Sequence, residues 1–304
     1  MNKDILKTIG NTPLVQTKYK NIFAKLEYFN PSGSVKDRAA FNILNTAFKR
    51  KLINKNTIII EATSGNMGIS LAFVSSALGL NFCAVMPENM TIERRKLISA
   101  YGAKIILTPA SEGMKGSVSK AAQLAESYKK KGKKVFIPSQ FENILNPLAH
   151  TQTAKEILKD TLGKVDAVFA GIGSGGTATG VGRYLKKINP KIKIIGVEPK
   201  ESPLLTKGVA GPHKIQGIGA NFVPKILDLK VIYKIVDVSS EDAFKTAREL
   251  AKEGLFVGIS AGAVFKAAKD YAKKNKNAKI VAILPDGGAR YLSGELVNEN
   301  IQNN

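Results

Sequence analysis

VDAVFAGIGSGGTATGVGRYLKK, residues 165–187, sets an apolar segment directly before a glycine-rich turn and a helical pattern. Residues 165–170, which are apolar apart from Asp166, predict a buried strand, and the pattern around Leu185 predicts a helix. Glycines let the backbone close around an anion, and a helix N-terminus supplies free N–H donors. Ser174 and Thr177 add hydroxyl groups where phosphate oxygens need them. The stretch therefore predicts an α/β fold with a phosphate-binding turn at the end of a strand.

Two other interpretations of this turn stay open. Its glycines also suit a turn that serves only the close packing of a strand against a helix. The run further fits a loose GxGxxG, and Glu198, at the end of the next predicted strand, could bind the ribose of a dinucleotide. A loose match of this kind is weak support for a dinucleotide site, because it lacks a clear partner motif.

The alternation of strand and helix extends along the whole chain. Predicted strands cover residues 57–60, 82–86, 104–107, 135–138, 167–170, 192–197 and 280–284. An amphipathic helical pattern follows each of them, which is typical of βαβ units around parallel sheets. One sheet with all these strands would be large, so we expect two α/β domains with a cleft between them and a boundary near Asn146.

Composition excludes several classes of protein. The chain has 304 residues, 44% of them hydrophobic, which is enough for two buried cores. No apolar run approaches the roughly 20 residues of a membrane span, and no signal peptide is evident, so we expect a soluble cytoplasmic protein without a membrane partner. The formal charge of +22 favours anionic substrates. Its lysines are spread along predicted helical faces, which argues against specific nucleic-acid binding.

Cysteine and histidine add little chemistry. Cys83 is the single cysteine, so an internal disulfide is impossible, and its apolar neighbours predict a buried side chain. His150 and His213 lack nearby metal ligands in the sequence, and we expect no metal site.

NPSGSVKDR, residues 30–38, places Lys36 in a Gly/Ser turn just before a helical pattern. A lysine whose pKa is lowered by its surroundings forms Schiff bases with carbonyl compounds, and pyridoxal phosphate is the commonest such partner. A solvated surface charge is the commoner interpretation of a single turn lysine. Other segments of the chain decide between a Schiff-base lysine and a surface charge.

Two more strand-to-helix turns gather polar groups. EATSGNMG, residues 61–68, combines hydroxyls and an amide with a helix N-terminus, which favours a carboxylate ligand. Ordinary capping by Thr63 or Ser64 is the alternative. GISAGA, residues 258–263, precedes an alanine-rich helix, and capping by Ser260 is the locally favoured interpretation.

Together these segments resemble the cysteine synthase (O-acetylserine sulfhydrylase) family of fold-type-II pyridoxal-phosphate enzymes over nearly the whole chain. Seven blocks occur in the family's order: IGNTPLV (9–15), NPSGSVKDR (30–38), TSGN (63–66), MPENMTIERRKL (86–97), EGMKGS (112–117), GPHKIQGIG (211–219) and RYLS (290–293). Chance does not give seven ordered matches, and they outweigh the interpretation of Lys36 as a surface charge.

The resemblance implies a fold with two three-layer α/β/α domains of the tryptophan synthase β type, with pyridoxal phosphate in the cleft between them. Residues 1–145 would form the first domain, whose mobile part, about 82–126, closes over the substrate. Residues 146–304 would form the second domain and carry the phosphate turn. The first strands, about 10–35, would join the sheet of the second domain.

The resemblance also implies roles for individual residues. Lys36 would bind the cofactor as a Schiff base and act as the catalytic general base, while Asn66 would bond the ring hydroxyl. Ser260 would face the pyridine nitrogen; a neutral hydroxyl cannot keep that nitrogen protonated, which favours elimination at the β-carbon. The phosphate would be held by Gly173, Ser174, Gly175, Gly176 and Thr177. The substrate carboxylate would be bound by Thr63, Ser64, Asn66 and Gln140, with Gly217 also in the substrate site.

The implied reaction is a β-replacement through an α-aminoacrylate, in which O-acetyl-L-serine and sulfide give L-cysteine and acetate. Among the departures from the family, Met67 replaces a threonine of TSGNTG, and Asn221 replaces a glycine of GIGAGF. These changes would reshape the substrate pocket for an enzyme that consumes cysteine, releases hydrogen sulfide and forms serine, lanthionine or another thioether. Neutral drift around an unchanged cysteine synthase stays equally open.

Partners follow from the same resemblance. Members of the family are homodimers and often bind the C-terminal tail of serine acetyltransferase in the active-site cleft. Asp286, at a predicted strand end, either borders the pyridine ring or caps the local backbone. A catalytically silent regulatory member of the family is a further alternative, and the retention of Lys36 weighs against it.

Overall fold

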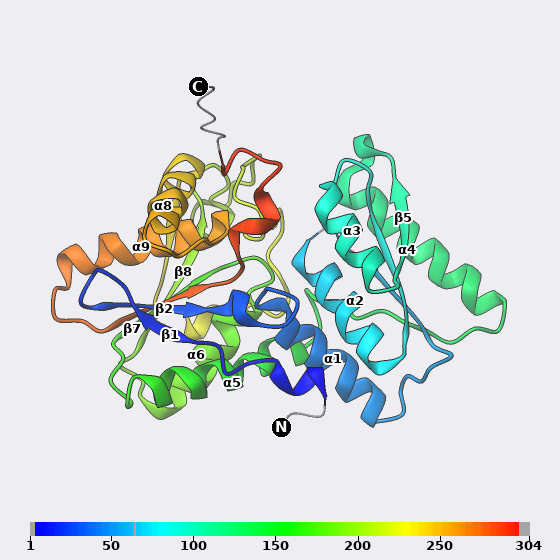
Figure 1. Ribbon diagram of the computed structural model, residues 1–304, viewed down its shortest axis with the longest axis horizontal. Helices are drawn as coiled ribbons and strands as arrows, with labels where there is room; N and C mark the ends of the chain where they lie inside the picture. Colours follow the sequence, from blue (N-terminus) through cyan, green and yellow to red (C-terminus); the bar gives the residue numbers. More distant parts are fainter. Residues whose placement is uncertain (1–3, 64, 298–304) are drawn as a thin grey trace, which may run out of the picture.

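The computed structural model describes residues 4–63 and 65–297, and Figure 1 shows them as two lobes. Within these residues the larger sheet has the strand order β1-β2-β10-β7-β8-β9 and the smaller sheet the order β5-β4-β3-β6. The larger sheet consists of β1 (Leu14–Gln16), β2 (Ile22–Leu26), β7 (Ala167–Gly171), β8 (Lys193–Pro199), β9 (Lys234–Val238) and β10 (Ile280–Leu284). The smaller sheet consists of β3 (Ile58–Ala62), β4 (Asn81–Pro87), β5 (Lys104–Thr108) and β6 (Val135–Phe136).

Helices cover both sheets. The larger sheet is accompanied by α5 (Leu145–Asp160), α6 (Gly176–Ile188), α7 (Leu204–Lys207), α8 (Ser240–Lys252) and α9 (Ile259–Lys274). The smaller sheet is accompanied by α1 (Lys36–Lys49), α2 (Asn66–Leu78), α3 (Ile92–Ala100) and α4 (Gly113–Lys130). Among the described helices, none has the length and apolar character to cross a membrane.

Strand β7 shows why the larger sheet is buried on both faces. Ala167 and Phe169 pack in the apolar cluster formed with α8 and α9, whereas Val168 and Ala170 pack in the cluster formed with α5 and α6. Successive side chains of a strand point to opposite faces, so a continuously apolar strand supplies both layers. The result is a three-layer α/β/α unit.

The smaller sheet is built in the same way. Ile59 of β3 packs with α1, α2 and α3, and its neighbour Ile60 packs with Ala121 and Ala125 of α4. All the pairs of strands in this sheet are parallel. The predicted α/β class with two three-layer units is confirmed.

Three local features differ from or sharpen the sequence predictions. The strand predicted at 135–138 ends at Phe136, ahead of Pro138, which has no N–H for a ladder. Strand β9 was not predicted, because Lys234 and Asp237 interrupt its apolar run at the sheet edge. Strands β1 and β2 lie in the larger sheet, where Leu26 pairs with Leu284.

The position expected for a domain boundary, Asn146, lies in the first turn of α5. This helix packs against α1 and α6, and α1 in turn packs against α2. Figure 1 shows α1 at the base of the molecule between the two lobes. The two sheets are therefore joined through packed helices.

Candidate active site

Lys36 is the first residue of α1, and its side chain is half-buried. The turn before it is bonded to the end of β10. The N–H of Val35 donates to the carbonyl oxygen of Pro285 at 2.8 Å, and Ser34 pairs with Asp286 in an isolated antiparallel bridge. The N–H of Lys36 itself donates to Ser34 Oγ at 3.3 Å. Two segments far apart in the sequence therefore fix the backbone that carries the lysine.

The surroundings of Lys36 favour its neutral form. Burial lowers the pKa of its ammonium group, and the negative charge of Asp286 partly opposes this shift. The neutral amine is the form that attacks a carbonyl carbon or accepts a proton. The half-buried position and the lowered pKa of Lys36 both differ from those of a solvated surface charge.

Asn66, the first residue of α2, lies beside the same carboxylate. Its Nδ2 donates to Asp286 Oδ2 at 2.6 Å, and its Oδ1 accepts a hydrogen bond from Arg290. The hydroxyl of Tyr291 donates to Asp286 Oδ2, also at 2.6 Å. Asp286 is 1% exposed, so these contacts are shielded from water. Sequence reasoning gave Arg290 no role, although it lies in the RYLS block.

The other described residues predicted to bind substrate in the turn of residues 61–68 do not share the contacts of Asn66. Thr63 is buried, and its N–H donates to the Val85 carbonyl oxygen at 3.0 Å, while the N-cap of α2 is Gly65 rather than Thr63. Ser64 lies outside the described residues. Met67 is 2% exposed and belongs to the apolar cluster of α1, α2 and α3. Its influence on a substrate would therefore pass through packing of α2.

The predicted phosphate turn follows β7 and opens α6. A Cβ on Gly173 would lie 2.3 Å from the carbonyl oxygen of Gly217, and one on Gly176 would lie 2.1 Å from Asn146 Oδ1. Gly175 has a φ of 80°, a conformation that side chains disfavour. Close packing therefore explains these glycines by itself, while the first N–H groups of a helix have no partner within the helix and suit an anion.

Side chains from α5 hold the hydroxyls of this turn. Asn146 Nδ2 donates to Ser174 Oγ at 3.1 Å and to the Gln140 carbonyl oxygen at 2.7 Å. Thr177 Oγ1 lies 3.3 Å from His150 Nε2, within hydrogen-bond reach. Sequence reasoning missed Asn146 as a site residue; its polar side chain beside a proline was the only signal.

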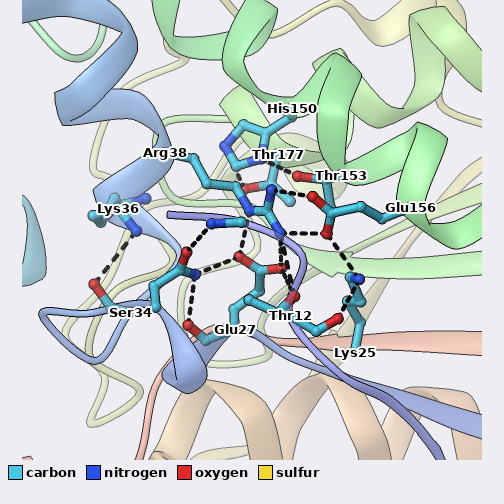
Figure 2. A network of polar contacts seen from close by, with 12 residues as sticks. Thr12, Lys25, Glu27, Ser34, Lys36, Arg38, His150, Thr153, Glu156 and Thr177 are labelled. Atoms are coloured by element: carbon cyan, nitrogen blue, oxygen red, sulfur yellow. Dashed lines mark hydrogen bonds and ion pairs between the residues drawn. The ribbon is translucent and has the colours of Figure 1, made fainter. Parts of the chain in front are cut away.

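Figure 2 shows a buried ionic network next to this turn. Arg38, two residues after Lys36, bonds Glu27 through Nε at 2.7 Å and Glu156 through Nη2 at 2.7 Å. Lys25, which is fully buried, lies 2.9 Å from Glu156 Oε2. Burial alone would raise the pKa of Glu156, but Arg38 and Lys25 lower it to about 2. The network ties α1 to α5 and β2.

His150 lies at the edge of this network, as Figure 2 also shows. Burial and the positive charge of Arg38 lower its pKa to about 3, so the ring is neutral at physiological pH. Its Nδ1 lies 3.2 Å from Thr153 Oγ1. The imidazole thus has a hydroxyl within hydrogen-bond reach of each nitrogen, which fixes the orientation of the ring.

Gln140 is anchored through its backbone. Glu61, at the end of β3, accepts hydrogen bonds from the N–H of Gln140 at 3.1 Å and of Ser139 at 3.0 Å. Burial raises the pKa of the Glu61 carboxyl to about 7, against the opposite effect of these two N–H groups. Sequence reasoning missed this residue, whose only signal was a carboxylate at the end of an apolar strand.

Ser260 lies buried in the first turn of α9, whose N-cap is Gly258, so capping by Ser260 is not its role. A Cβ on Gly217 would lie 3.8 Å from Ser260 Oγ, which places the loop of Gly217 beside this helix start. Asn221, four residues later, is exposed. The structure thus brings Gly217 and Ser260 together with Gly173.

Glu198 is occupied by another interaction. Its carboxylate accepts hydrogen bonds from the N–H of Leu205 at 2.9 Å and of Thr206 at 3.1 Å. It therefore binds the backbone at the start of α7, which argues against the ribose contact of a dinucleotide site.

Comparisons with known proteins agree with this arrangement. The family model described as pyridoxal-phosphate dependent enzyme matches residues 5–286. The chain belongs to this family. Cysteine synthase B of Campylobacter jejuni is 52% identical to the enzyme, over 97% of this chain and 99% of the relative.

Solved structures also resemble this pyridoxal-phosphate dependent enzyme. Cysteine synthase from Entamoeba histolytica superposes with a TM-score of 0.93 at 40% identity, and the match covers 100% of this chain and 93% of the other. A hydrogen sulfide-producing enzyme from Fusobacterium nucleatum superposes with a TM-score of 0.91 at 46% identity, covering 96% and 100%. The expected family and cofactor class are confirmed.

The residues of the enzyme fit pyridoxal phosphate. The α6 turn offers N–H groups and two hydroxyls to a phosphate, and Lys36 offers a half-buried amine with a lowered pKa. Asp286 Oδ1 is buried and has no hydrogen-bond partner within the described residues.

Proposed function

We propose that this enzyme catalyses β-replacement on an amino acid, with O-acetyl-L-serine and sulfide giving L-cysteine and acetate. The observation that carries the proposal is the half-buried amine of Lys36 with its lowered pKa, set at a helix start beside Asp286. Support for the substrates comes from the relatives named cysteine synthase, up to 52% identical over nearly the full chain.

Lys36 is the proton carrier in this proposal. When bound, pyridoxal phosphate supplies an aldehyde that takes up amino groups and a ring that withdraws electrons from the α-carbon. The neutral amine of Lys36 accepts the α-proton while acetate leaves the β-carbon. Sulfide then forms the new bond to the β-carbon, and Lys36 returns its proton to the α-carbon, which balances the reaction.

The other site residues bind and orient. Ser174 and Thr177, with the N–H groups around Gly175 and Gly176, would hold the phosphate. Asn66 would bind the ring hydroxyl of the cofactor, and the hydroxyl of Ser260 would face its pyridine nitrogen. The substrate carboxylate binds at the start of α2, where a helix N-terminus favours an anion. Thr63, Ser64, Asn66 and Gln140 are the residues proposed to bind this carboxylate.

A second candidate reaction is the consumption of cysteine with release of hydrogen sulfide. The hydrogen sulfide-producing enzyme from Fusobacterium nucleatum is 46% identical, and the match covers 100% of that chain. Asn221 is exposed in the loop after Gly219, where it would change the polarity met by an incoming nucleophile. Water, a second cysteine or another thiol would then be the acceptor.

The test compares two variants of α1, Lys36→Ala and Lys49→Ala. Lys49 is exposed at the far end of the same helix and serves as the control. We expect the first variant to lose turnover and the visible absorbance of the bound cofactor, and the second to keep both. Full turnover by Lys36→Ala would contradict the role of Lys36, and a wild-type protein that binds no cofactor would favour a silent binding member.

Donor choice separates the two candidate reactions. Turnover of O-acetyl-L-serine plus sulfide is compared with turnover of L-cysteine alone, with release of cysteine and sulfide as the respective readouts. A large preference for O-acetyl-L-serine supports the cysteine synthase. Faster sulfide release from cysteine alone supports the second candidate and removes the first.

We also propose that the enzyme works as a cytoplasmic homodimer and admits the C-terminal tail of a serine acetyltransferase to its cleft. The support is the resemblance to cysteine synthases over nearly the full chain. Light scattering measures the oligomeric state. Competition between a C-terminal acetyltransferase peptide and the amino-acid substrate measures binding of the tail in the cleft.

A further inference from the structure

Arg94 spans the gap between the two lobes. It lies in α3, which belongs to the smaller lobe, and its side chain is 6% exposed in spite of its charge. Its Nη2 donates a hydrogen bond to Gln216 Oε1, and its guanidinium carbon lies 5.6 Å from the centre of the Tyr291 ring. Gln216 and Tyr291 both belong to segments of the larger lobe.

The contact with Tyr291 leads directly to the site residues. Tyr291 donates to Asp286 Oδ2, and the same oxygen accepts from Asn66 Nδ2, each at 2.6 Å. Burial and the charge of Asp286 raise the pKa of the Tyr291 hydroxyl well above its usual value, and the charge of Arg94 opposes them. The phenol therefore stays protonated, and a cation over its ring strengthens the hydroxyl as a donor.

The contact with Gln216 leads to the phosphate turn. Gln216 precedes Gly217, whose carbonyl oxygen is packed against Gly173. A second residue of α3 supports the same crossing: the pKa of Glu93 is lowered by its own backbone N–H and by a hydrogen bond from the hydroxyl of Ser293. The start of α3 therefore contacts the larger lobe at two loops, those of Gln216 and Ser293.

We propose that Arg94 is a positioning residue that holds the lobes together in the arrangement in which Tyr291 and Asp286 fix Asn66. Its contacts with Gln216 and Tyr291 form only while α3 lies against the larger lobe. Separation of the lobes would break both of these contacts and leave Tyr291 without the cation over its ring. The inference rests on the proposed function in one respect, since Asn66 is a site residue there.

The experiment uses Arg94→Met, Gln216→Leu and their combination in the full chain, with Lys96→Met as the matched control. Lys96 is an exposed cation on the same helix, so the control removes an equal charge. The first readout is hydrogen exchange of the α3 amides in the protein without cofactor. We expect exchange about tenfold faster in Arg94→Met and unchanged in Lys96→Met, because the lost contacts hold α3 in place.

The second readout is steady-state kinetics of the loaded enzyme. We expect Arg94→Met to raise KM for the amino-acid substrate about tenfold, with a smaller change in kcat, and Arg94→Lys to recover part of the loss. The combined variant should cost no more than Arg94→Met, because both substitutions break one contact. Exchange and KM equal to those of Lys96→Met would overturn the proposal. A wild-type protein without turnover would instead contradict the proposed function, while the exchange result would still decide the role of Arg94.

Discussion

Asn66 and Asp286, which are 220 residues apart, are joined by a hydrogen bond of 2.6 Å from Nδ2 to Oδ2. One belongs to the start of α2 in the smaller lobe and the other follows β10 in the larger lobe. The bonded carboxylate also acts on Lys36, whose pKa it raises against the effect of burial. One buried charge thus connects the proposed cofactor ligand with the proposed base.

Removing this charge is expected to lower the pKa of Lys36 further. Asp286→Asn keeps the shape of the side chain but loses the negative charge that favours the ammonium form. In the protein without cofactor, the pH midpoint for labelling of Lys36 by an amine-specific reagent should move to lower pH, as read by peptide mass spectrometry. Asp270→Asn, in an exposed ion pair, is the control. An unchanged midpoint in Asp286→Asn would contradict the coupling.

The raised pKa of the Glu61 carboxyl predicts that the stability of the fold depends on pH. The pKa of its carboxyl is about 7 in the folded chain against an ordinary value of 4.5, so folding favours the protonated form. Its contribution to stability is present below about pH 4.5 and is lost as the pH rises through about 7. From about pH 5 to about pH 8, the free energy of unfolding should fall by roughly 2 kcal/mol more in wild type than in Glu61→Gln.

Urea unfolding at the two pH values measures this difference. The subtraction removes the titration of all groups that the two proteins share. Equal changes in wild type and Glu61→Gln would show that the carboxyl titrates normally.

Gly173→Ala is expected to disrupt the phosphate turn. The added Cβ would lie 2.3 Å from a backbone oxygen, so either the α6 turn or the Gly217 loop must move. We expect a lower Tm and a loss of bound pyridoxal phosphate, measured as cofactor per chain after gel filtration. Gly294→Ala is the control, because its Cβ would meet its nearest atom at 3.5 Å. Normal cofactor content in Gly173→Ala would contradict the placement of the phosphate.

Glu156→Gln is expected to destabilise the fold strongly. Glu156 balances the buried cations of Lys25 and Arg38, and its removal leaves an uncompensated charge in the core. Loss of one member of a buried pair costs roughly 3–5 kcal/mol. Glu295→Gln, which removes an exposed partner of Lys214, should cost less than about 1 kcal/mol. Urea unfolding measures the loss in the free energy of unfolding for each variant. Similar losses in the two variants would show that the buried network does not stabilise the fold.

Local sequence determined most of the secondary structure and the family. The apolar strand before the glycine turn fixed β7 and α6, because periodicity and backbone freedom are properties of neighbouring residues. The ordered sequence blocks indicated the family, and the resemblance to it implied the roles proposed for Lys36 and the phosphate turn. Strand β9 escaped prediction, since an edge strand needs apolar residues on one face only.

The tertiary structure alone decided which charges meet. Glu27, Arg38 and Glu156 come from three segments, and no spacing in the sequence predicts that they share one buried network. Sequence spacing likewise does not predict the contact of the Arg94 guanidinium with the Tyr291 ring, or the hydrogen bond from Asn66 to Asp286. The physical reason is that burial sets both the strength and the pKa of such contacts, and burial exists only once distant segments pack. The sequence thus predicts that Lys36 is the reactive amine, and the packing of the lobes decided what surrounds it.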